Sequence, residues 1–102
     1  MQQIQILLPI YNNEGESFQS DLYSDIKGEL VEKFGGLTAY SRSPAKGLWK
    51  ENEAKLVQDD IVIYEIMADQ IDQAFWKGYK EKLKKLFEQD EIVIRATEIT
   101  LI

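Results

Sequence analysis

The segment from Phe34 to Lys50, FGGLTAYSRSPAKGLWK, gathers residue types that are suited to binding an anionic or flat ligand. It contains three cations, three aromatic side chains, a proline and three glycines, in a chain whose formal net charge is −6. Arginine offers a bidentate fork to a carboxylate or phosphate, and tryptophan and tyrosine offer faces for stacking. If residues 37–50 form one strand with a bulge at the proline, Tyr40 and Arg42 share a side. We therefore predict a ligand-binding site that comprises Tyr40, Arg42, Trp49 and Arg95.

The same segment also admits a structural explanation. Tyr40 and Trp49 could pack over a hairpin while the three cations of the segment stay in water, since aromatic residues commonly form cross-strand pairs. Pro44 would then mark an edge strand or a bulge, because proline cannot donate to a strand ladder. The sequence leaves both explanations open.

Acid–base and metal chemistry have few candidates in this chain. It contains no His and no Cys, which excludes thiolate nucleophiles, iron–sulfur clusters and cysteine zinc sites, and leaves a transition metal without its usual ligands. Asp21 and Asp25 lie four residues apart but match no known ligand loop. We expect no metal, no cofactor and a non-enzymatic protein.

One enzymatic alternative remains, a cofactor-independent oxygenase or isomerase that uses Glu65, Tyr64 or Asn12 in its chemistry. This alternative requires an enclosed cavity between helices and sheet. A buried Glu65 could act as a general base with a raised pKa, but beside Arg95 it would form a charge pair instead. We favour pairing over catalysis.

The second predicted helix is the most basic element of the chain. A basic amphipathic helix can dock an acidic partner or nucleic acid. However, cations near a helix C-terminus and a pair such as Glu81 and Lys85 also follow from helix electrostatics. With 18 acidic against 12 basic side chains, we expect no nucleic-acid partner. The lysines concerned are Lys77, Lys80, Lys82, Lys84 and Lys85.

Trp76 directly follows Phe75 and therefore cannot point in the same direction on a helix. We expect Trp76 at a rim over the sheet edge or in an interface, where tryptophan is enriched. An exposed apolar patch around Trp76 would favour a second alternative function, that of a regulatory protein-binding subunit.

Hydrophobic periodicity predicts the first half of the fold. Ile4, Ile6 and Leu8 alternate with other residues and predict a strand over residues 2–9. Apolar residues then recur every four positions from Phe18, which predicts a helix that ends at Gly35, because glycine readily adopts the left-handed conformation of a helix terminus. A second strand starts over residues 37–42.

The second half repeats this order. Residues 57–67 are rich in β-branched and aromatic side chains and predict a third strand, after a hairpin tip at residues 51–54. A second helix is predicted to begin near Asp69, as its N-cap, and to end near Asp90. Residues 92–102 form the predicted last strand.

The resulting order, βαββαβ, predicts a single domain over residues 1–102 of the α+β class. At this length the order indicates a ferredoxin-like sandwich, a four-stranded antiparallel sheet with two helices on one face. The other face must be solvated, covered or used for binding. Both faces of the third strand are apolar, so we expect a second copy to cover the open face and predict a homodimer. The two faces are Val62, Tyr64 and Ile66 against Ile61, Ile63 and Met67.

The sequence also predicts the compartment. The run MQQIQILLPI lacks a basic region and a cleavage site, so we expect no signal peptide. No stretch approaches the ~20 apolar residues of a membrane span. The absence of Cys fits a reducing environment. We expect a cytoplasmic protein with no membrane partner.

Four stretches carry a resemblance to a known family: ILLPIYNNEG, FGGLTAYSRSPAKGLW, DDIVIYEIM and FEQDEIVIRATEI. Together they resemble a family of small bacterial proteins of unknown function, and the likeness spans nearly the whole chain. The resemblance implies a bacterial, cytoplasmic protein with a ferredoxin-like fold. It implies no reaction and no catalytic residue.

Overall fold

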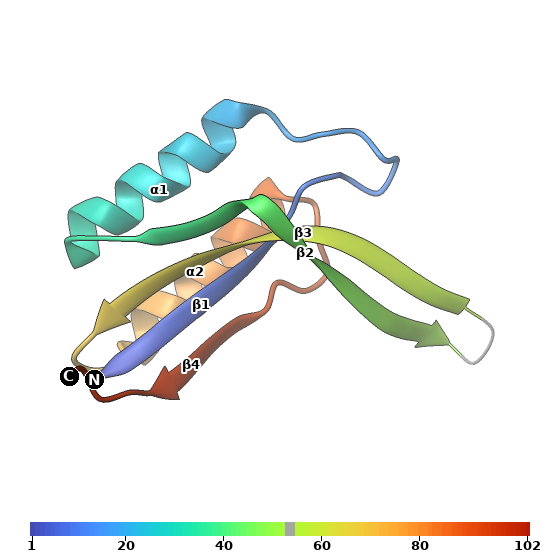
Figure 1. Cartoon of the computed structure of the whole chain (residues 1–102). Helices are drawn as coiled ribbons and strands as arrows, with labels where there is room; N and C mark the ends of the chain where they lie inside the picture. Colours follow the sequence, from blue (N-terminus) through green and yellow to red (C-terminus); the bar gives the residue numbers. More distant parts are fainter. Residues whose placement is uncertain (53–54) are drawn as a thin grey trace.

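The computed structural model describes the backbone of residues 1–52 and 55–102, and side chains at residues 1–41, 48 and 60–102. Four strands and two helices follow one another in the predicted order, βαββαβ (Figure 1). No helix within these ranges is long and apolar enough to cross a membrane. The elements are β1 (Gln2–Pro9), α1 (Ser20–Phe34), β2 (Thr38–Asn52), β3 (Lys55–Ala68), α2 (Gln73–Leu86) and β4 (Ile94–Glu98).

The four strands form one antiparallel sheet in the order β2-β3-β1-β4. The central strand β1 pairs with both β3 and β4, so that Gln5 lies opposite Glu65 on one side and Arg95 on the other. Both helices pack against the same face of the sheet, as the single core cluster that they share with β1 and β3 shows. The ferredoxin-like sandwich predicted from the element order is confirmed.

The core lies between the helices and one face of the sheet. Alternate residues of β1 supply its floor, because side chains of a strand point to opposite faces in turn, and Ile4, Ile6 and Leu8 are at most 1% exposed. Each helix contributes a stripe of apolar side chains that packs onto this floor. The helix residues concerned are Ile26 and Leu30 of α1, and Trp76, Tyr79 and Leu83 of α2.

The helix termini show which capping predictions hold. Gly35 has a φ of 85°, and its N–H donates to the Val31 carbonyl, so α1 ends where predicted. The predicted N-cap of α2, Asp69, is wrong. Asp72 is the N-cap, because α2 begins at Gln73 and the Asp72 carboxylate accepts from the Phe75 N–H at 3.0 Å. A capping side chain belongs to the residue directly before the helix and accepts an N–H two or three residues further on.

Strands β2 and β3 are much longer than their neighbours. They contain 15 and 14 residues, against 8 in β1 and 5 in β4. Pairing of β1 with β3 stops at Pro9 opposite Ile61, so the far half of the β2–β3 hairpin projects beyond the sheet as a two-stranded ribbon (Figure 1). The register of β2 against β3 shifts between Tyr40 and Ala45, the interval that contains Pro44.

The last strand is shorter than predicted. It covers Ile94–Glu98 rather than residues 92–102, because β4 is an edge strand whose only neighbour is β1. Pairing ends with Gln2 opposite Glu98, and the Ile99 N–H then bonds to the Met1 carbonyl. Residues after Ile99 have no residue of β1 opposite them, and so the strand ends.

One side chain ties α1 to the end of β1. The Tyr23 hydroxyl donates to the Pro9 carbonyl at 2.5 Å. Burial, with a smaller effect of the nearby Tyr64, raises the pKa of Tyr23 from 10.0 to about 12. Because the folded-state pKa is the higher one, the stability that neutral Tyr23 contributes is present below pH 10.0 and is lost as the pH rises towards 12.

We expect Tyr23→Phe to lower the free energy of unfolding at neutral pH by about 1 kcal/mol, because it removes this hydrogen bond. The variant should also lose less stability than the wild type as the pH rises above 10.0. Urea unfolding across this pH range measures both effects. Tyr11→Phe is the control, because Tyr11 is 46% exposed. Equal pH profiles for wild type and Tyr23→Phe would contradict the expectation.

Candidate functional site on the open face of the sheet

A row of four polar side chains crosses the open face of the sheet, the face away from the helices. The Tyr40 hydroxyl donates to Glu65 Oε2 at 3.4 Å, and Gln5 Nε2 donates to Glu65 Oε1 at 2.9 Å. Arg95 Nε donates to Gln5 Oε1 at 2.9 Å. Each of the four strands contributes one member of this polar row, namely Tyr40, Glu65, Gln5 and Arg95.

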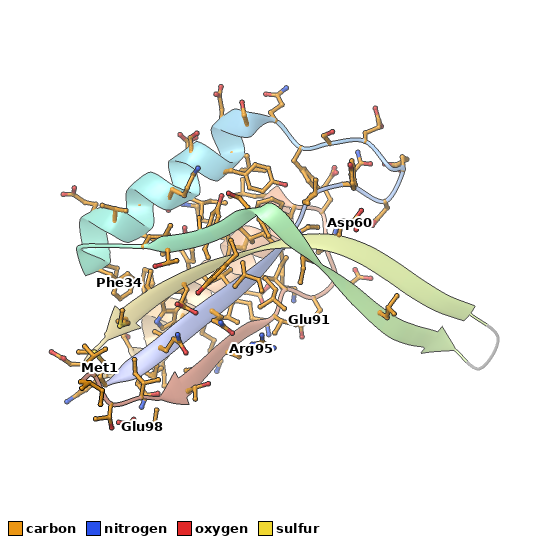
Figure 2. The ribbon with its side chains drawn as sticks, in the orientation of Figure 1. Met1, Phe34, Asp60, Glu91, Arg95 and Glu98 are labelled. Carbon is orange, nitrogen blue, oxygen red and sulfur yellow. The ribbon has the colours of Figure 1, made fainter. Side chains whose placement is uncertain are left out.

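Strand register places these residues on one side. Gln5 is flanked in β1 by Ile4 and Ile6, which face the helices, so its own side chain points to the open face. Glu65 and Arg95 are its direct partners on β3 and β4, and cross-strand partners share a face. Figure 2 shows Arg95 on the side of the sheet away from α2.

Glu65 is the buried member of the row, with only 9% of its surface exposed. Its carboxylate is held by donors from both neighbouring strands, as a buried charge requires. The expected direct pair with Arg95 is not formed. The strand order places β1 between β3 and β4, so the Gln5 amide lies between the two charged groups and bonds to each.

Arg95 is exposed, and its terminal guanidinium nitrogens bond to no other side chain that the structure describes. Around the row lie apolar side chains that are open to solvent. Tyr40 is 47% exposed, and Met67 and Val93 are each 45% exposed. A cation with free donors among exposed apolar groups is suited to contact an anionic or aromatic surface.

The open face exposes less apolar surface than the sequence suggests. Ile61, expected to need cover from another chain, is only 8% exposed within this one. Ile63 is half-buried, and Met67 remains open. The part of the face that lacks cover therefore lies towards Met67 and β4.

The predicted site residues do not all meet within one chain. Tyr40 lies on β2 and Arg95 on β4, at opposite edges of the sheet. Three inter-strand spacings separate their backbones by about 14 Å. Arg42 and Trp49 both lie in β2, and Trp49 pairs with Val57 on the ribbon. The side chains of Arg42 and Trp49 lie outside the described residues.

The residues named for an enzymatic alternative are not brought together. Tyr64 and Glu65 are neighbours in β3 and point to opposite faces, Tyr64 into the core and Glu65 to the open face. Asn12 Oδ1 accepts the N–H groups of Glu14 and Glu16, each at 2.9 Å, and so shapes the turn after β1. Among the residues whose side chains the structure describes, no group of three acidic residues is placed to hold a metal ion.

Trp76 is buried, with 7% of its surface exposed, and stacks on Phe34 at a centroid distance of 5.5 Å. Trp76 itself therefore does not contribute an exposed surface of the kind that the regulatory-subunit alternative requires. Trp76 instead forms one wall of a groove between α2 and β4, with a volume of about 320 Å³. The adjacent aromatic pair of Phe75 and Trp76 signals this groove only weakly in the sequence.

Two members of the polar row, Gln5 and Glu65, were absent from the predicted binding set. Their signal in the sequence is a polar residue at an alternate position within an apolar strand. Gln5 stands between Ile4 and Ile6, and Glu65 stands between Tyr64 and Ile66.

Comparison with known proteins supports the fold alone. No protein-family model matches the chain, and no curated protein matches its sequence. Among solved structures, a phage SAM lyase in complex with S-methyl-5'-thioadenosine is similar, with a TM-score of 0.60, 13% identity, and coverage of 95% of this chain and 80% of that chain. This similarity shows a shared fold.

Two further structures show the same similarity. The phage SAM lyase in its apo state has a TM-score of 0.62 and 11% identity, over 95% of this chain and 79% of that chain. A point variant of CutA1 from Pyrococcus horikoshii OT3 has a TM-score of 0.59 and 13% identity, over 100% of this chain and 86% of that chain. The chain is thus a small α+β protein of the same fold.

We expect Gln5→Met to lower the free energy of unfolding by about 2 kcal/mol, because it removes a donor from the buried Glu65 carboxylate. Gln3→Met is the matched control, since Gln3 shares the open face of β1 and makes no side-chain hydrogen bond with a described residue. Chemical denaturation of both variants tests this. Equal losses for the two would show that the polar row does not stabilise the sheet.

Proposed function

We propose that this protein is a non-enzymatic binding module that works as a homodimer through the open face of its sheet. The observation that carries the proposal is the composition of that face. A hydrogen-bonded polar row with the buried Glu65 carboxylate in it is surrounded by exposed apolar side chains, and the terminal guanidinium nitrogens of Arg95 remain open at the edge. Such a surface is suited to a partner that is both flat and complementary in polarity.

Charge distribution supports association through this face. Although the chain carries a net charge of −6, Glu65 and Arg95 are the charged groups among the described open-face positions of the sheet, and their charges balance. Acidic side chains are concentrated instead on the outer surface of α1, with examples at Asp21, Asp25 and Glu32. Two acidic copies therefore repel each other least when their open faces meet.

Two-fold symmetry would complete the predicted ligand site. An axis that lies between the two sheets and parallel to their strands turns β2 of one copy over β4 of the other. Tyr40 of one copy then faces the partner's Arg95, although the two residues stand at opposite edges within one chain. Arg42 and Trp49 follow Tyr40 along β2 and accompany it.

The ligand that such a site would take is a small anionic or aromatic molecule. Arg95 supplies free donors for a carboxylate or phosphate, and Tyr40 supplies an exposed aromatic face. The residues Glu65, Tyr64 and Asn12 do not converge on a reacting group, so the geometry favours binding over catalysis. The long β2–β3 ribbon extends past the sheet and has the reach to contact a second copy.

We expect the wild type to be a dimer at micromolar concentration and Met67→Glu to weaken the dimer by at least tenfold, because the variant buries a charge in the interface. Val31→Glu is the matched control. Val31 is also 45% exposed but lies on α1, away from the open face. Light scattering coupled to size-exclusion chromatography measures the mass. A monomeric wild type, or an unchanged dimer in Met67→Glu, would contradict the proposed interface.

Native mass spectrometry tests the ligand site. We expect the purified dimer to carry a reproducible extra mass that disappears in Arg95→Ala, because the free guanidinium donors are lost. Thr97→Ala, on the same face of β4, is the control that keeps those donors. An extra mass that persists in Arg95→Ala would reject Arg95 as a ligand contact.

A further inference from the structure

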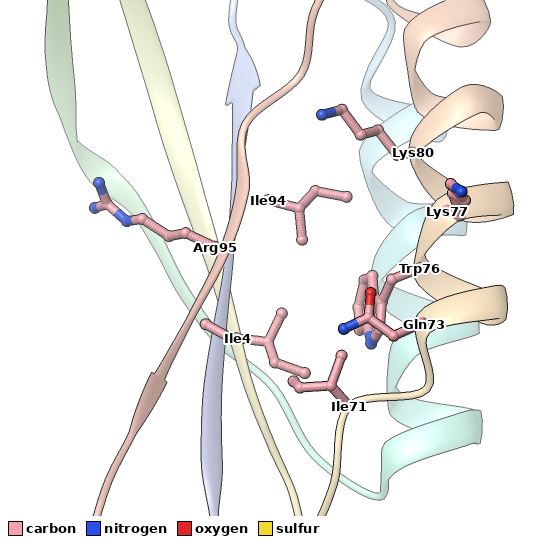
Figure 3. Close-up of a pocket in the computed structure, with 9 residues that line it drawn as sticks. Ile4, Ile71, Gln73, Trp76, Lys77, Lys80, Ile94 and Arg95 are labelled. Carbon is pink, nitrogen blue, oxygen red and sulfur yellow. The ribbon is translucent and has the colours of Figure 1, made fainter.

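The groove between α2 and β4 lies on the opposite side of the sheet from the polar row. It is lined by nine residues from β1, α2, β4 and the segment before α2, and it holds about 320 Å³. This volume is at the lower end of the range found for small-molecule pockets. Figure 3 shows Ile4, Ile71 and Ile94 pointing into the space between α2 and β4, while Arg95 points away from it.

The walls of the groove are apolar and rigid. Trp76 forms one wall and is held by aromatic neighbours, with Phe34 stacked at 5.5 Å and Phe75 edge-on at 5.0 Å. Ile71 and Ile94 provide aliphatic surface nearby. A wall that is fixed before the ligand arrives lowers the entropy lost on binding.

The rim of the groove is cationic. Lys77 and Lys80 line it, and none of its nine lining residues is acidic, in a chain with 18 acidic side chains. The helix macrodipole favours cations in the last turn, where Lys84 and Lys85 lie, but not at Lys77 in the second turn of α2. The macrodipole therefore does not account for the position of Lys77.

The two rim lysines differ in their availability. Lys77 makes no ion pair with any side chain that the structure describes. Lys80 pairs with Glu91 at 2.8 Å, and its hydrogen bond is the main cause that lowers the pKa of Glu91. Because Glu91 is exposed, this pair is screened by water and is weak. Lys80 can therefore exchange Glu91 for a competing anion.

One buried donor in the groove lacks a partner. Trp76 is 93% buried, since 7% of its surface is exposed, yet its indole N–H bonds to no described atom. Figure 3 places the indole nitrogen at the end of the groove beside Gln73 and Ile71. Buried donors without an acceptor are rare and call for an explanation. Gln73 is exposed and makes no hydrogen bond with a described residue, so it can move aside for an acceptor.

From these observations we propose that the groove binds a small amphipathic carboxylate. Its aliphatic or aromatic body lies against Ile71, Trp76 and Ile94, and its negative charge is met by Lys77 and Lys80. Oxygen acceptors of such a ligand also supply the partner that the indole N–H lacks. The site belongs to a single chain and does not depend on the dimer of the proposed function.

The test uses octanoate as the probe and 1-octanol as its neutral counterpart. The indole N–H signals of ¹⁵N-labelled protein are followed by NMR, and Trp49→Phe assigns the two tryptophans. We expect octanoate to shift the Trp76 indole signal in a saturable way and to leave the Trp49 signal in place. 1-Octanol should bind at least tenfold more weakly, because it carries no charge for the lysines.

Charge variants complete the test. Lys77→Gln combined with Lys80→Gln should weaken octanoate binding at least tenfold, whereas Lys85→Gln, a lysine of α2 outside the groove, should leave it unchanged. Met67→Glu should also leave it unchanged, which separates this site from the open face. A Trp76 signal that does not respond to octanoate, or equal affinity for octanoate and 1-octanol, would overturn the proposal.

Discussion

The register of the central strand β1 is the constraint on which the rest of the structure depends. β1 bonds to β3 on one side and to β4 on the other, so it alone links the two halves of the sheet. A slip of one residue would turn Ile4, Ile6 and Leu8 to the open face and Gln5 into the core. The core and the polar row are thus two consequences of one pairing.

The two faces of this sheet differ in how they accommodate polar side chains. The helix face excludes polar groups almost completely and is filled by aliphatic and aromatic side chains. The open face tolerates the charge of Glu65, because donors from two neighbouring strands reach it. Gln5 is the residue that makes this arrangement work, since its amide has both a donor for Glu65 and an acceptor for Arg95. The Gln5 amide therefore connects Glu65 and Arg95, which make no direct contact with each other.

The two candidate binding surfaces follow from the same edge strand. β4 contains five residues, and it directs Arg95 to the open face and Ile94 to the groove beside α2. A short edge strand leaves part of α2 uncovered, so Trp76 meets a hollow on that side rather than another strand. The same strand limits self-association along its edge, because few unpaired backbone groups remain to recruit another chain.

The sequence by itself determined the element order, the fold class and several boundaries. The range of β1 and the end of α1 at Gly35 follow from local periodicity and from the conformational freedom of a single glycine. It did not determine which side chains meet. Tyr40 and Arg95 were predicted in one site and lie at opposite sheet edges, and Glu65 bonds to Gln5 rather than Arg95. Strand order, register and the length of β4 arise from pairing between residues far apart in the chain. Because each strand's partner lies outside its local sequence, only the tertiary structure decides these features.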